Sequence, residues 1–439
     1  MRTENGLLTD SNFMVIADTS LKQLENLDNP IRVGMVGAGV TGRMIALQLC
    51  SPVPGIRLVA IANRTLEKAR AAYSNAGIEN VKAVGDLGTL EDRVAEYQPS
   101  IVEDAKLLTE AGNIDIIVDV TGTVEFGARL ALEAIGRKKH LVLVNAELDS
   151  TLGPILKFKA DRAGVVFTNT DGDEPGVAMT LLRYVESLGL RPVAAGNLKG
   201  LIDKYRTPET QREFAAKYGQ DAVKVTSFAD GTKLSMEATI LANATGFGVG
   251  RQGMYGPKCH HVKEMAQLLP DYQLLGGGLV DYALGAEPHT GAFVIVYEDN
   301  PKKQKELAYY KMGEGPFYVF YTPYHLPHLQ IASTIARAVL FNDATVAPLG
   351  APVCEVAAFA KRDLKAGERL DGVGGYTAYG VIENADVFAK RDFLPMGISE
   401  GCRLLRDVPK DDPILFTDTE RPPGRLIDTL RIEQLARFG

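Results

Sequence analysis

Acidic side chains gather beside glycines in the stretch Asp171-Gly-Asp173-Glu174-Pro-Gly, which follows the apolar residues 165–169. Three neighbouring carboxylates can hold a hard divalent cation such as Mg²⁺ or Mn²⁺ through oxygen ligands, or can transfer a proton. We therefore consider Asp173 and Glu174 as metal ligands or catalytic groups. The alternative is an acidic cap on a helix that begins near Gly176, because Asp and Glu favour helix amino termini.

Two lysines follow a predicted strand in the stretch 196–204, which reads Gly-Asn-Leu-Lys-Gly-Leu-Ile-Asp-Lys. Lys199 and Lys204 are candidates for binding a substrate phosphate or for stabilising a developing alkoxide. For Lys204 the alternative is the solvated start of a helix, since Tyr205 and Arg206 follow it. That alternative fits Lys199 less well, because it lies between Asn197 and Gly200.

Residues 230–239 form a third patch, in which polar and apolar side chains alternate. Alternation predicts a strand that presents Lys233, Ser235 and Glu237 on one face. Such a face belongs either to an active site or to ordinary solvent-exposed surface. Glu237 joins Asp173 and Glu174 as a candidate metal ligand.

A glycine-dense loop, residues 246–257, carries the single arginine Arg251. The loop suits the covering of a ligand or the binding of an anion, and a flexible linker is the alternative. Further along, His325 and His328 lie three residues apart among prolines. We interpret this pair as structural histidines rather than catalytic ones.

A glycine fingerprint lies at the end of the apolar stretch 31–36, where Gly37, Gly39 and Gly42 form G-x-G-x-x-G at the start of an amphipathic helix. In this context the first glycine makes a tight turn, the second lets the backbone approach a pyrophosphate, and the third permits close helix–strand packing. The helix amino terminus, with Val40 and Thr41, adds unpaired N–H groups. The fingerprint predicts a dinucleotide site.

The residues that follow the next strands favour NADPH as the dinucleotide. An acid that would bind the ribose hydroxyls of NAD is missing, and Arg64 can instead bind a 2′-phosphate with its planar guanidinium group. The alternative is that Arg64 begins a solvated helix face. The other predicted cofactor contacts follow strands at the same edge of the sheet: Asn63, Thr65, Thr121, Gly122, Asn145 and Ala146, with Glu147 next to them as a catalytic candidate.

Strands and helices alternate from Ile31 onward, which is typical of βαβ units and a parallel sheet. We predict an α/β protein with a Rossmann NADP-binding domain, an α+β catalytic and dimerisation domain, and a mostly β carboxyl-terminal domain. The boundaries we expect are 1–30 for an amino-terminal arm packed on a neighbour, 31–170, 171–349 and 350–439. The last domain lacks a dense cluster of acids, bases and cations, so we predict a structural or interface role for it.

Composition excludes several classes of protein. The net charge of −7 provides no basic surface for nucleic acid. The four cysteines form no CxxC or pairing pattern, and no apolar run is long enough to span a membrane. A signal peptide is not evident either, so we expect a cytoplasmic enzyme.

The fingerprint, Asn63-Arg64-Thr65, Thr121-Gly122 and the Asn145-Ala strand end resemble the homoserine dehydrogenase group of NADP enzymes. The segment Ala360-Lys-Arg-Asp-Leu-Lys-Ala-Gly-Glu-Arg-Leu and the later Leu394-Pro-Met-Gly-Ile resemble an SAF domain. As a whole the chain is similar to the DXR-like reductoisomerases, which convert 1-deoxyxylulose 5-phosphate to methylerythritol phosphate in isoprenoid biosynthesis, the MEP pathway.

This resemblance implies a homodimer that uses NADPH, a divalent cation and a phosphorylated small-molecule substrate. The cations expected to act on that substrate are Lys199, Lys204, Lys233 and Arg251. One departure is Glu147, where homoserine dehydrogenases have a lysine. Two alternatives stay open: a homoserine dehydrogenase-like reductase of another small aldehyde or oxo acid, and a non-catalytic NADPH-binding sensor.

Overall fold

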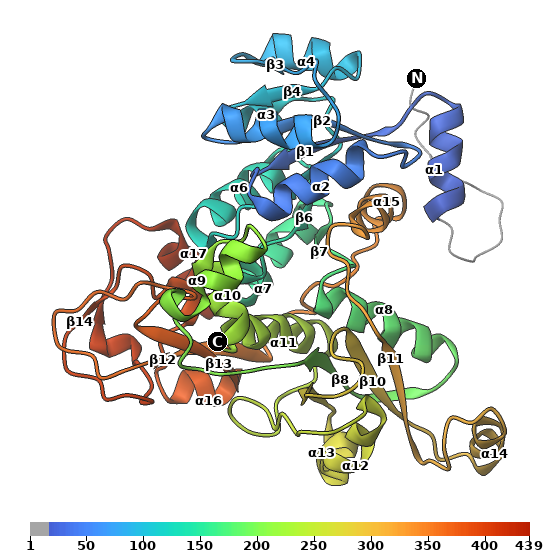
Figure 1. Cartoon of the computed structure of the whole chain (residues 1–439), viewed down its shortest axis with the longest axis vertical. Coiled ribbons are helices and arrows are strands. Elements are labelled where there is room, and N and C mark those ends of the chain that lie inside the picture. Colours follow the sequence, from blue (N-terminus) through green and yellow to red (C-terminus); the bar gives the residue numbers. More distant parts are fainter. Residues whose placement is uncertain (1–16) are drawn as a thin grey trace.

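The computed structural model describes residues 17–439, and its amino-terminal part is built on a seven-stranded parallel sheet (Figure 1). The strand order is β3-β4-β2-β1-β5-β6-β7. The central strands β2, β1 and β5 are buried except at Arg32 and Arg57, because helices cover both faces. The predicted α/β class is confirmed. The strands are β1 (Ile31–Val36), β2 (Ile56–Ala62), β3 (Lys82–Ala83), β4 (Ser100–Val102), β5 (Ile116–Asp119), β6 (His140–Leu143) and β7 (Phe167–Asn169).

The helices of this domain follow its strands, as right-handed βαβ connections require. They are α2 (Val40–Cys50), α3 (Leu66–Asn75), α4 (Leu87–Ala95), α5 (Lys106–Glu110), α6 (Val124–Gly136) and α7 (Ala146–Ala163). The strand order reverses direction at β1, so a crevice opens between the carboxyl ends of β1 and β5. That crevice is where a doubly wound sheet binds its ligand.

A second sheet of four strands, in the order β11-β10-β8-β9, forms the next domain. Its strands are β8 (Arg191–Lys199), β9 (Leu279–Leu284), β10 (Ala292–Tyr297) and β11 (Phe317–Thr322). The long helices α8 (Glu174–Ser187) and α11 (Thr232–Thr245) share one apolar core with this sheet, and the short α12 (Met265–Leu268) and α13 (Asp271–Gly276) share another. Three peripheral helices complete the domain: α9 (Pro208–Lys217), α10 (Ala222–Ala229) and α14 (Pro301–Tyr309).

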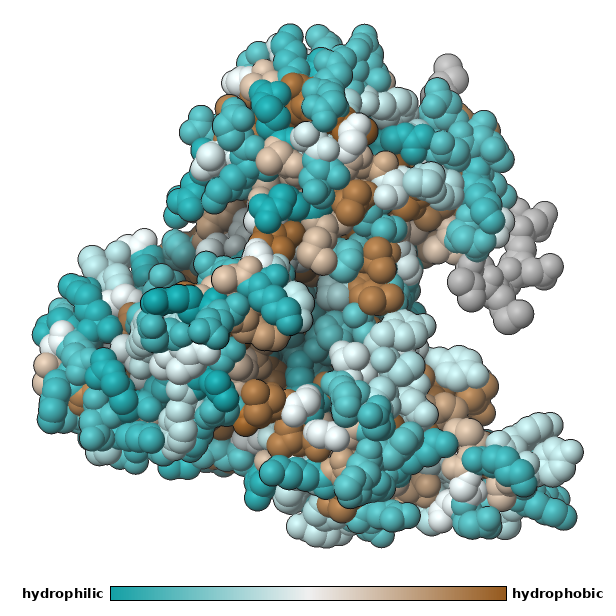
Figure 2. Space-filling view, in the orientation of Figure 1, coloured by the Kyte–Doolittle hydropathy of each residue, from teal (hydrophilic) through white to brown (hydrophobic). Residues whose placement is uncertain are grey.

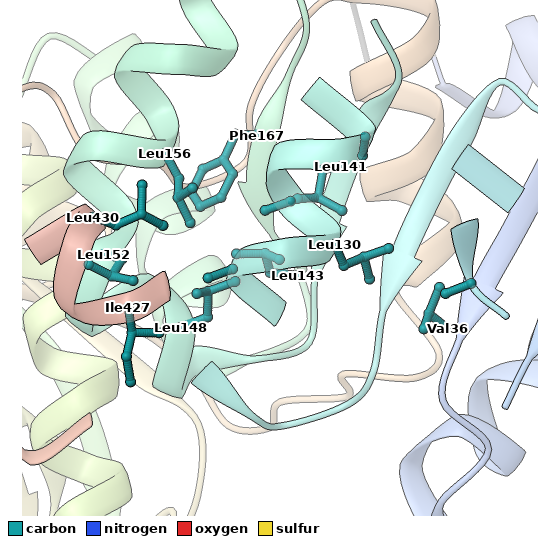
Figure 3. Packing of buried hydrophobic residues seen from close by; sticks show 14 of the residues in the cluster. Val36, Leu130, Leu141, Leu143, Leu148, Leu152, Leu156, Phe167, Ile427 and Leu430 are labelled. Carbon is teal, nitrogen blue, oxygen red and sulfur yellow. The ribbon is translucent and has the colours of Figure 1, made fainter. Parts of the chain in front are cut away.

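The carboxyl-terminal residues form short antiparallel ladders and two helices. The elements are β12 (Cys354–Ala360), β13 (Ala378–Asn384), α16 (Ala385–Lys390), β14 (Arg403–Leu404), β15 (Thr419–Glu420) and α17 (Leu426–Phe438). Helix α17 returns to the first domain, where Ile427 and Leu430 pack beside Leu148 and Leu152 of α7 (Figure 3). One hydrophobic core therefore joins the first domain to the last helix of the chain.

Two expectations about the elements are corrected. Residues 232–245 form helix α11 rather than a strand; the helix is buried on every side, so its sequence lacks the one-sided apolar pattern of a surface helix. Helix α1 (Ala17–Asn26) packs on this chain's own first domain, where Glu25 pairs with Arg57; the rest of the predicted arm lies outside the described residues. Helix α15 (Ile331–Phe341) also packs on the first domain.

Candidate functional site

The glycine fingerprint has the backbone geometry that its spacing predicts. Gly37 has φ +106°, and a Cβ there would lie 2.9 Å from the carbonyl oxygen of Val120. A Cβ on Gly42 would collide with the carbonyl oxygen of Gly37, so α2 packs directly on the turn. Gly39 has no atom near its missing Cβ and opens onto free space, where a pyrophosphate can approach the backbone.

A cavity of about 1200 Å³ extends from this loop along the carboxyl edge of the sheet. Five predicted cofactor residues line it: Gly37, Gly39, Asn63, Arg64 and Thr121. The sequence did not indicate several other lining residues, among them Val84, Gly85, Glu103, Asp104, Glu125, Arg129 and Lys224. The remaining predicted residues lie next to the cavity and do not line it: Val40, Thr41, Gly42, Thr65, Gly122, Asn145 and Ala146.

Asn63 lines the cavity and also makes two hydrogen bonds within the protein. Its side-chain oxygen accepts a hydrogen bond from the N–H of Ala38 at 3.1 Å, and its amide donates to the carbonyl of Thr65 at 2.8 Å. The side chain thus braces the glycine loop. Arg64 makes no ion pair within the described part of the chain, so its guanidinium group is available to an anion in the cavity.

Beyond Thr121 the cavity edge leads to the second domain. The Asn145 amide donates to the Asp119 carboxylate at 2.9 Å and lies 3.4 Å from the Thr121 hydroxyl, and its side-chain oxygen caps α7. Two residues later, Glu147 accepts from Lys233 of α11 at 3.3 Å. This contact joins the cofactor edge of the sheet to a charged cluster in the second domain. Figure 2 shows that the surface is hollowed between the first domain and the rest of the molecule.

The cluster consists of side chains from four elements. Glu147 lies on α7, and Lys199 ends β8. Asp173 caps α8 and Glu174 begins it, while Lys233 and Glu237 lie one turn apart on α11. The Lys199 ammonium donates to Glu174 at 2.7 Å and to Glu237 at 3.1 Å. Carboxylate oxygens of Asp173, Glu174 and Glu237 all lie within 4.8 Å of one another. The structure therefore brings together six of the eight predicted catalytic residues, with Glu147 as the sixth.

Burial and mutual repulsion separate the pKa values of the carboxyls. Burial and the charge of Glu174 raise the pKa of Asp173 to about 6 and that of Glu237 to about 8. Burial also opposes ionisation of Glu174, but Lys199 and His325 outweigh it and hold its pKa at about 2. For Lys199 and Lys233 the neighbouring carboxylates outweigh burial and raise the pKa, so both lysines stay charged.

The cluster has an excess of negative charge when all its groups are ionised. Glu147, Asp173, Glu174 and Glu237 supply four carboxylates, and Lys199 and Lys233 supply two ammonium groups. Two uncompensated charges in a buried site require protons or a bound cation. The donors are oxygens, which suit Mg²⁺ or Mn²⁺. Lys199 and His325 contact Oε1 of Glu174, and Lys199 and Asn197 contact Oε2 of Glu237. The other oxygen of each carboxylate, with Asp173, fits such a cation.

Two predicted cations lie elsewhere. Lys204 pairs with Asp411 of the carboxyl-terminal domain at 3.0 Å, because the chain turns away from the cluster after β8. Arg251 donates to the carbonyls of Met254 and Tyr255 at 2.9 and 3.0 Å and thereby closes its own loop. The expectation that they join Lys199 and Lys233 is wrong.

His325 joins the site, although the sequence led us to interpret it as structural. Its Nε2 lies 3.6 Å from Oε1 of Glu174, and its Nδ1 shares a hydrogen bond of 2.9 Å with the hydroxyl of Thr290. The side chain is about a third exposed, so it connects the buried cluster to solvent. The sequence signal was a histidine in the loop that directly follows β11. The prolines of that loop indicate a turn but do not show where the histidine side chain lies.

A comparison with protein families matches residues 172–331 to the family described as oxidoreductase DRL, catalytic domain. This match covers well under half of the chain and includes the cluster apart from Glu147. A search of curated proteins finds no match. Together with the dinucleotide fold, the family match confirms the prediction of a nicotinamide-dependent oxidoreductase, so the sensor alternative is set aside.

Solved structures resemble the chain only distantly. A probable dehydrogenase from Thermotoga maritima is 16% identical with a TM-score of 0.36, over 61% of this chain and 73% of that one. A putative myo-inositol dehydrogenase from Sinorhizobium meliloti is 12% identical with a TM-score of 0.40, over 71% and 90%. Scyllo-inositol dehydrogenase from Lactobacillus casei, bound to NAD(H) and scyllo-inositol, is 12% identical with a TM-score of 0.33, over 60% and 73%.

These findings correct the identification from sequence. The matched family is described only as an oxidoreductase, so the DXR-like reductoisomerase and its place in isoprenoid biosynthesis are not supported. The family match ends at residue 331 and gives no support to an SAF domain.

Among residues 17–439 no helix is long and apolar enough to cross a membrane. The homodimer stays a prediction.

Proposed function

We propose that this protein is an NADPH-dependent oxidoreductase that interconverts a carbonyl and an alcohol on a small hydroxylated aldehyde or ketone. The observation that carries this proposal is the contact between Glu147 and Lys233, which sets the charged cluster against the end of the cofactor cavity. A carbonyl held there would lie between the cofactor and the cluster. Arg64, which has no described ion pair, supports NADPH over NADH.

When bound, NADPH supplies the hydride. Lys199 and Lys233 stay charged and stabilise the negative charge that develops on the carbonyl oxygen. Asp173, Glu174 and Glu237 would hold Mg²⁺ or Mn²⁺, which supplies further charge stabilisation and a template for a hydroxyl and carbonyl pair. His325 delivers the proton to the oxygen, because it reaches both Glu174 and solvent.

The charge of the cluster favours a substrate without a phosphate. Only two of the four predicted cations are present, and carboxylates already neutralise both. Carboxylates accept hydrogen bonds from hydroxyl groups and repel a phosphate. The phosphorylated substrate stays a prediction. It is tested by comparing turnover of one sugar with turnover of the phosphate ester of the same sugar.

The test is NADPH oxidation at 340 nm with a panel of hydroxylated aldehydes and ketones, each with and without a phosphate, in the presence of Mg²⁺ or Mn²⁺. We expect turnover of unphosphorylated substrates that Lys199→Met abolishes. Turnover that survives Lys199→Met would contradict the assignment of the cluster. A preference for the phosphorylated form of the same sugar would contradict the proposed substrate class.

A further inference from the structure

One cation in the cofactor cavity comes from outside the Rossmann domain. Lys224 lies on α10 of the second domain and lines the same cavity as Gly37, Gly39 and Thr121. Its Nζ is 3.5 Å from the position that a Cβ on Gly122 would occupy. The lysine therefore reaches across the gap between the domains and lies over the carboxyl end of β5.

Some charged side chains that line the cavity have an ion-pair partner and others do not. The acids are Glu103, Asp104 and Glu125, and Arg129 pairs with Glu125 at 3.4 Å. Arg64 and Lys224 have no ion-pair partner among residues 17–439. They occupy different places in the cavity. Arg64 follows β2, whereas Lys224 lies beside Gly122, three residues after the end of β5. The cavity thus presents two separate positions for anionic groups.

Helix α10 is held firmly although the lysine head is exposed. The Asp221 side chain accepts hydrogen bonds from the backbone N–H groups of Val223 and Lys224 at 2.9 and 3.1 Å. Val225, Thr226 and Ser227, which directly follow Lys224, are buried. A Cβ on Gly374 would collide with the carbonyl of Val223, so the carboxyl-terminal domain packs directly against the helix. The packing fixes the backbone of Lys224 and leaves its ammonium in the cavity.

The position of the ammonium relative to the sheet selects the anion. β1 and β5 are neighbours, with Val36 opposite Asp119, and a Cβ on Gly37 would touch the carbonyl of Val120. The crevice between these strands is where a dinucleotide places its diphosphate, on the amino terminus of α2. Lys224 lines the same cavity as the glycine loop and lies beside Gly122, so its ammonium can reach this crevice. Lysine binds phosphate groups as a point charge.

We propose that Lys224 binds the diphosphate of the dinucleotide and closes the cavity from the second domain. This inference rests on the proposed function, because it requires a nicotinamide dinucleotide in the cavity. It separates the two free cations by role: Lys224 recognises a group that NADPH and NADH share, and Arg64 recognises the 2′-phosphate that only NADPH carries. The second domain then contributes to cofactor binding as well as to the substrate site.

The test measures binding of each reduced cofactor to the full chain through the fluorescence of its dihydronicotinamide, without substrate. Lys224→Met should weaken NADPH and NADH equally, by about tenfold, which is the effect of losing one charged contact. Arg64→Met should weaken NADPH alone. Lys224→Arg should retain most of the affinity, and Lys302→Met on the exposed helix α14 should change nothing.

The outcomes distinguish this inference from the proposed function. If the unaltered protein binds neither cofactor, the proposed function fails. If it binds both and Lys224→Met binds both as tightly, Lys224 does not contact the cofactor and the inference is overturned. A loss confined to NADPH would place Lys224 at the 2′-phosphate and would also overturn it. Far-ultraviolet circular dichroism confirms that each variant is folded.

Discussion

Replacing Lys199 by methionine tests whether the charged cluster depends on this ammonium. The ammonium contacts Glu174 and Glu237 at 2.7 and 3.1 Å, and both carboxylates are almost fully buried. Methionine keeps the apolar stem and removes the charge. Breaking a buried pair from one side costs about 3–5 kcal/mol, because the partner charges stay behind unpaired. We expect the free energy of unfolding to fall by about that amount at pH 8.

The pKa of Glu174 supports this magnitude. A lowering from 4.5 to about 2 corresponds to about 3 kcal/mol of stabilisation, to which Lys199 is the main favourable contributor. Because the folded-state pKa is lowered, this stabilisation is present above pH 4.5 and is lost as the pH falls toward 2. The difference between the unaltered protein and Lys199→Met should therefore be larger at pH 8 than at pH 4.

Urea unfolding followed by circular dichroism at both pH values provides the measurement. The matched control is Lys365→Met, which removes a 2.8 Å pair with Asp407 in which both side chains are exposed, and we expect no measurable loss. Adding Glu237→Gln to Lys199→Met should restore part of the stability, since one unpaired carboxylate is removed. If Lys199→Met unfolds no more easily than Lys365→Met at pH 8, the cluster does not depend on the ammonium and the reasoning is refuted.

Four further predictions follow from the same geometry. Arg64→Ala should lower the ratio of kcat/KM for NADPH to that for NADH by at least about tenfold, and an unchanged ratio in steady-state kinetics would remove its assignment. Mn²⁺ affinity should rise as the pH passes about 8, because the Glu237 carboxyl must lose its proton to bind, and calorimetric titration should show no such rise in Glu237→Gln. His325→Asn should lower kcat by about 10²–10⁴-fold with cofactor binding unchanged, and an unaltered kcat would exclude it as the proton donor. A chain ending at residue 349 should not fold, since it exposes the core around α7, and a cooperative thermal transition for it would contradict this.

The cofactor loop could be predicted from sequence because its constraints are local. Gly37, Gly39 and Gly42 are required by contacts with their own strand and helix, so their spacing alone specifies the turn. The same locality explains why Asp173, Glu174 and Lys199 lie close to the ends of elements, at the start of α8 and the end of β8. Side chains at strand ends and helix starts do not need the rest of the fold to be placed.

The errors concern residues whose position depends on packing between domains. Lys204 lies only five residues after Lys199, yet it faces Asp411, which is far along the chain. Lys233 and Glu237 were assigned to a strand and reach the site from a helix, because a spacing of four suits one helix face as well as alternate strand positions. Lys224 could not be predicted, since its helix lines the cavity only through the orientation of two domains.

The carboxyl-terminal domain positions helix α11 although it contributes no residue to the cluster. At the start of α11, Lys361 forms a buried pair with Asp230 at 2.8 Å. The hydroxyl of Thr232 accepts a hydrogen bond from the N–H of Gly380 on β13, and Ser235 donates to the carbonyl of the same residue at 3.0 Å. Lys233 lies between these anchors and faces the other way, so β13 holds one side of α11 while its other side carries the charges. Gly374 also contacts α10, so the third domain packs against both helices that bring lysines to the cofactor edge. A region that contributes no residue to the cluster can therefore still affect where the charges of the cluster lie.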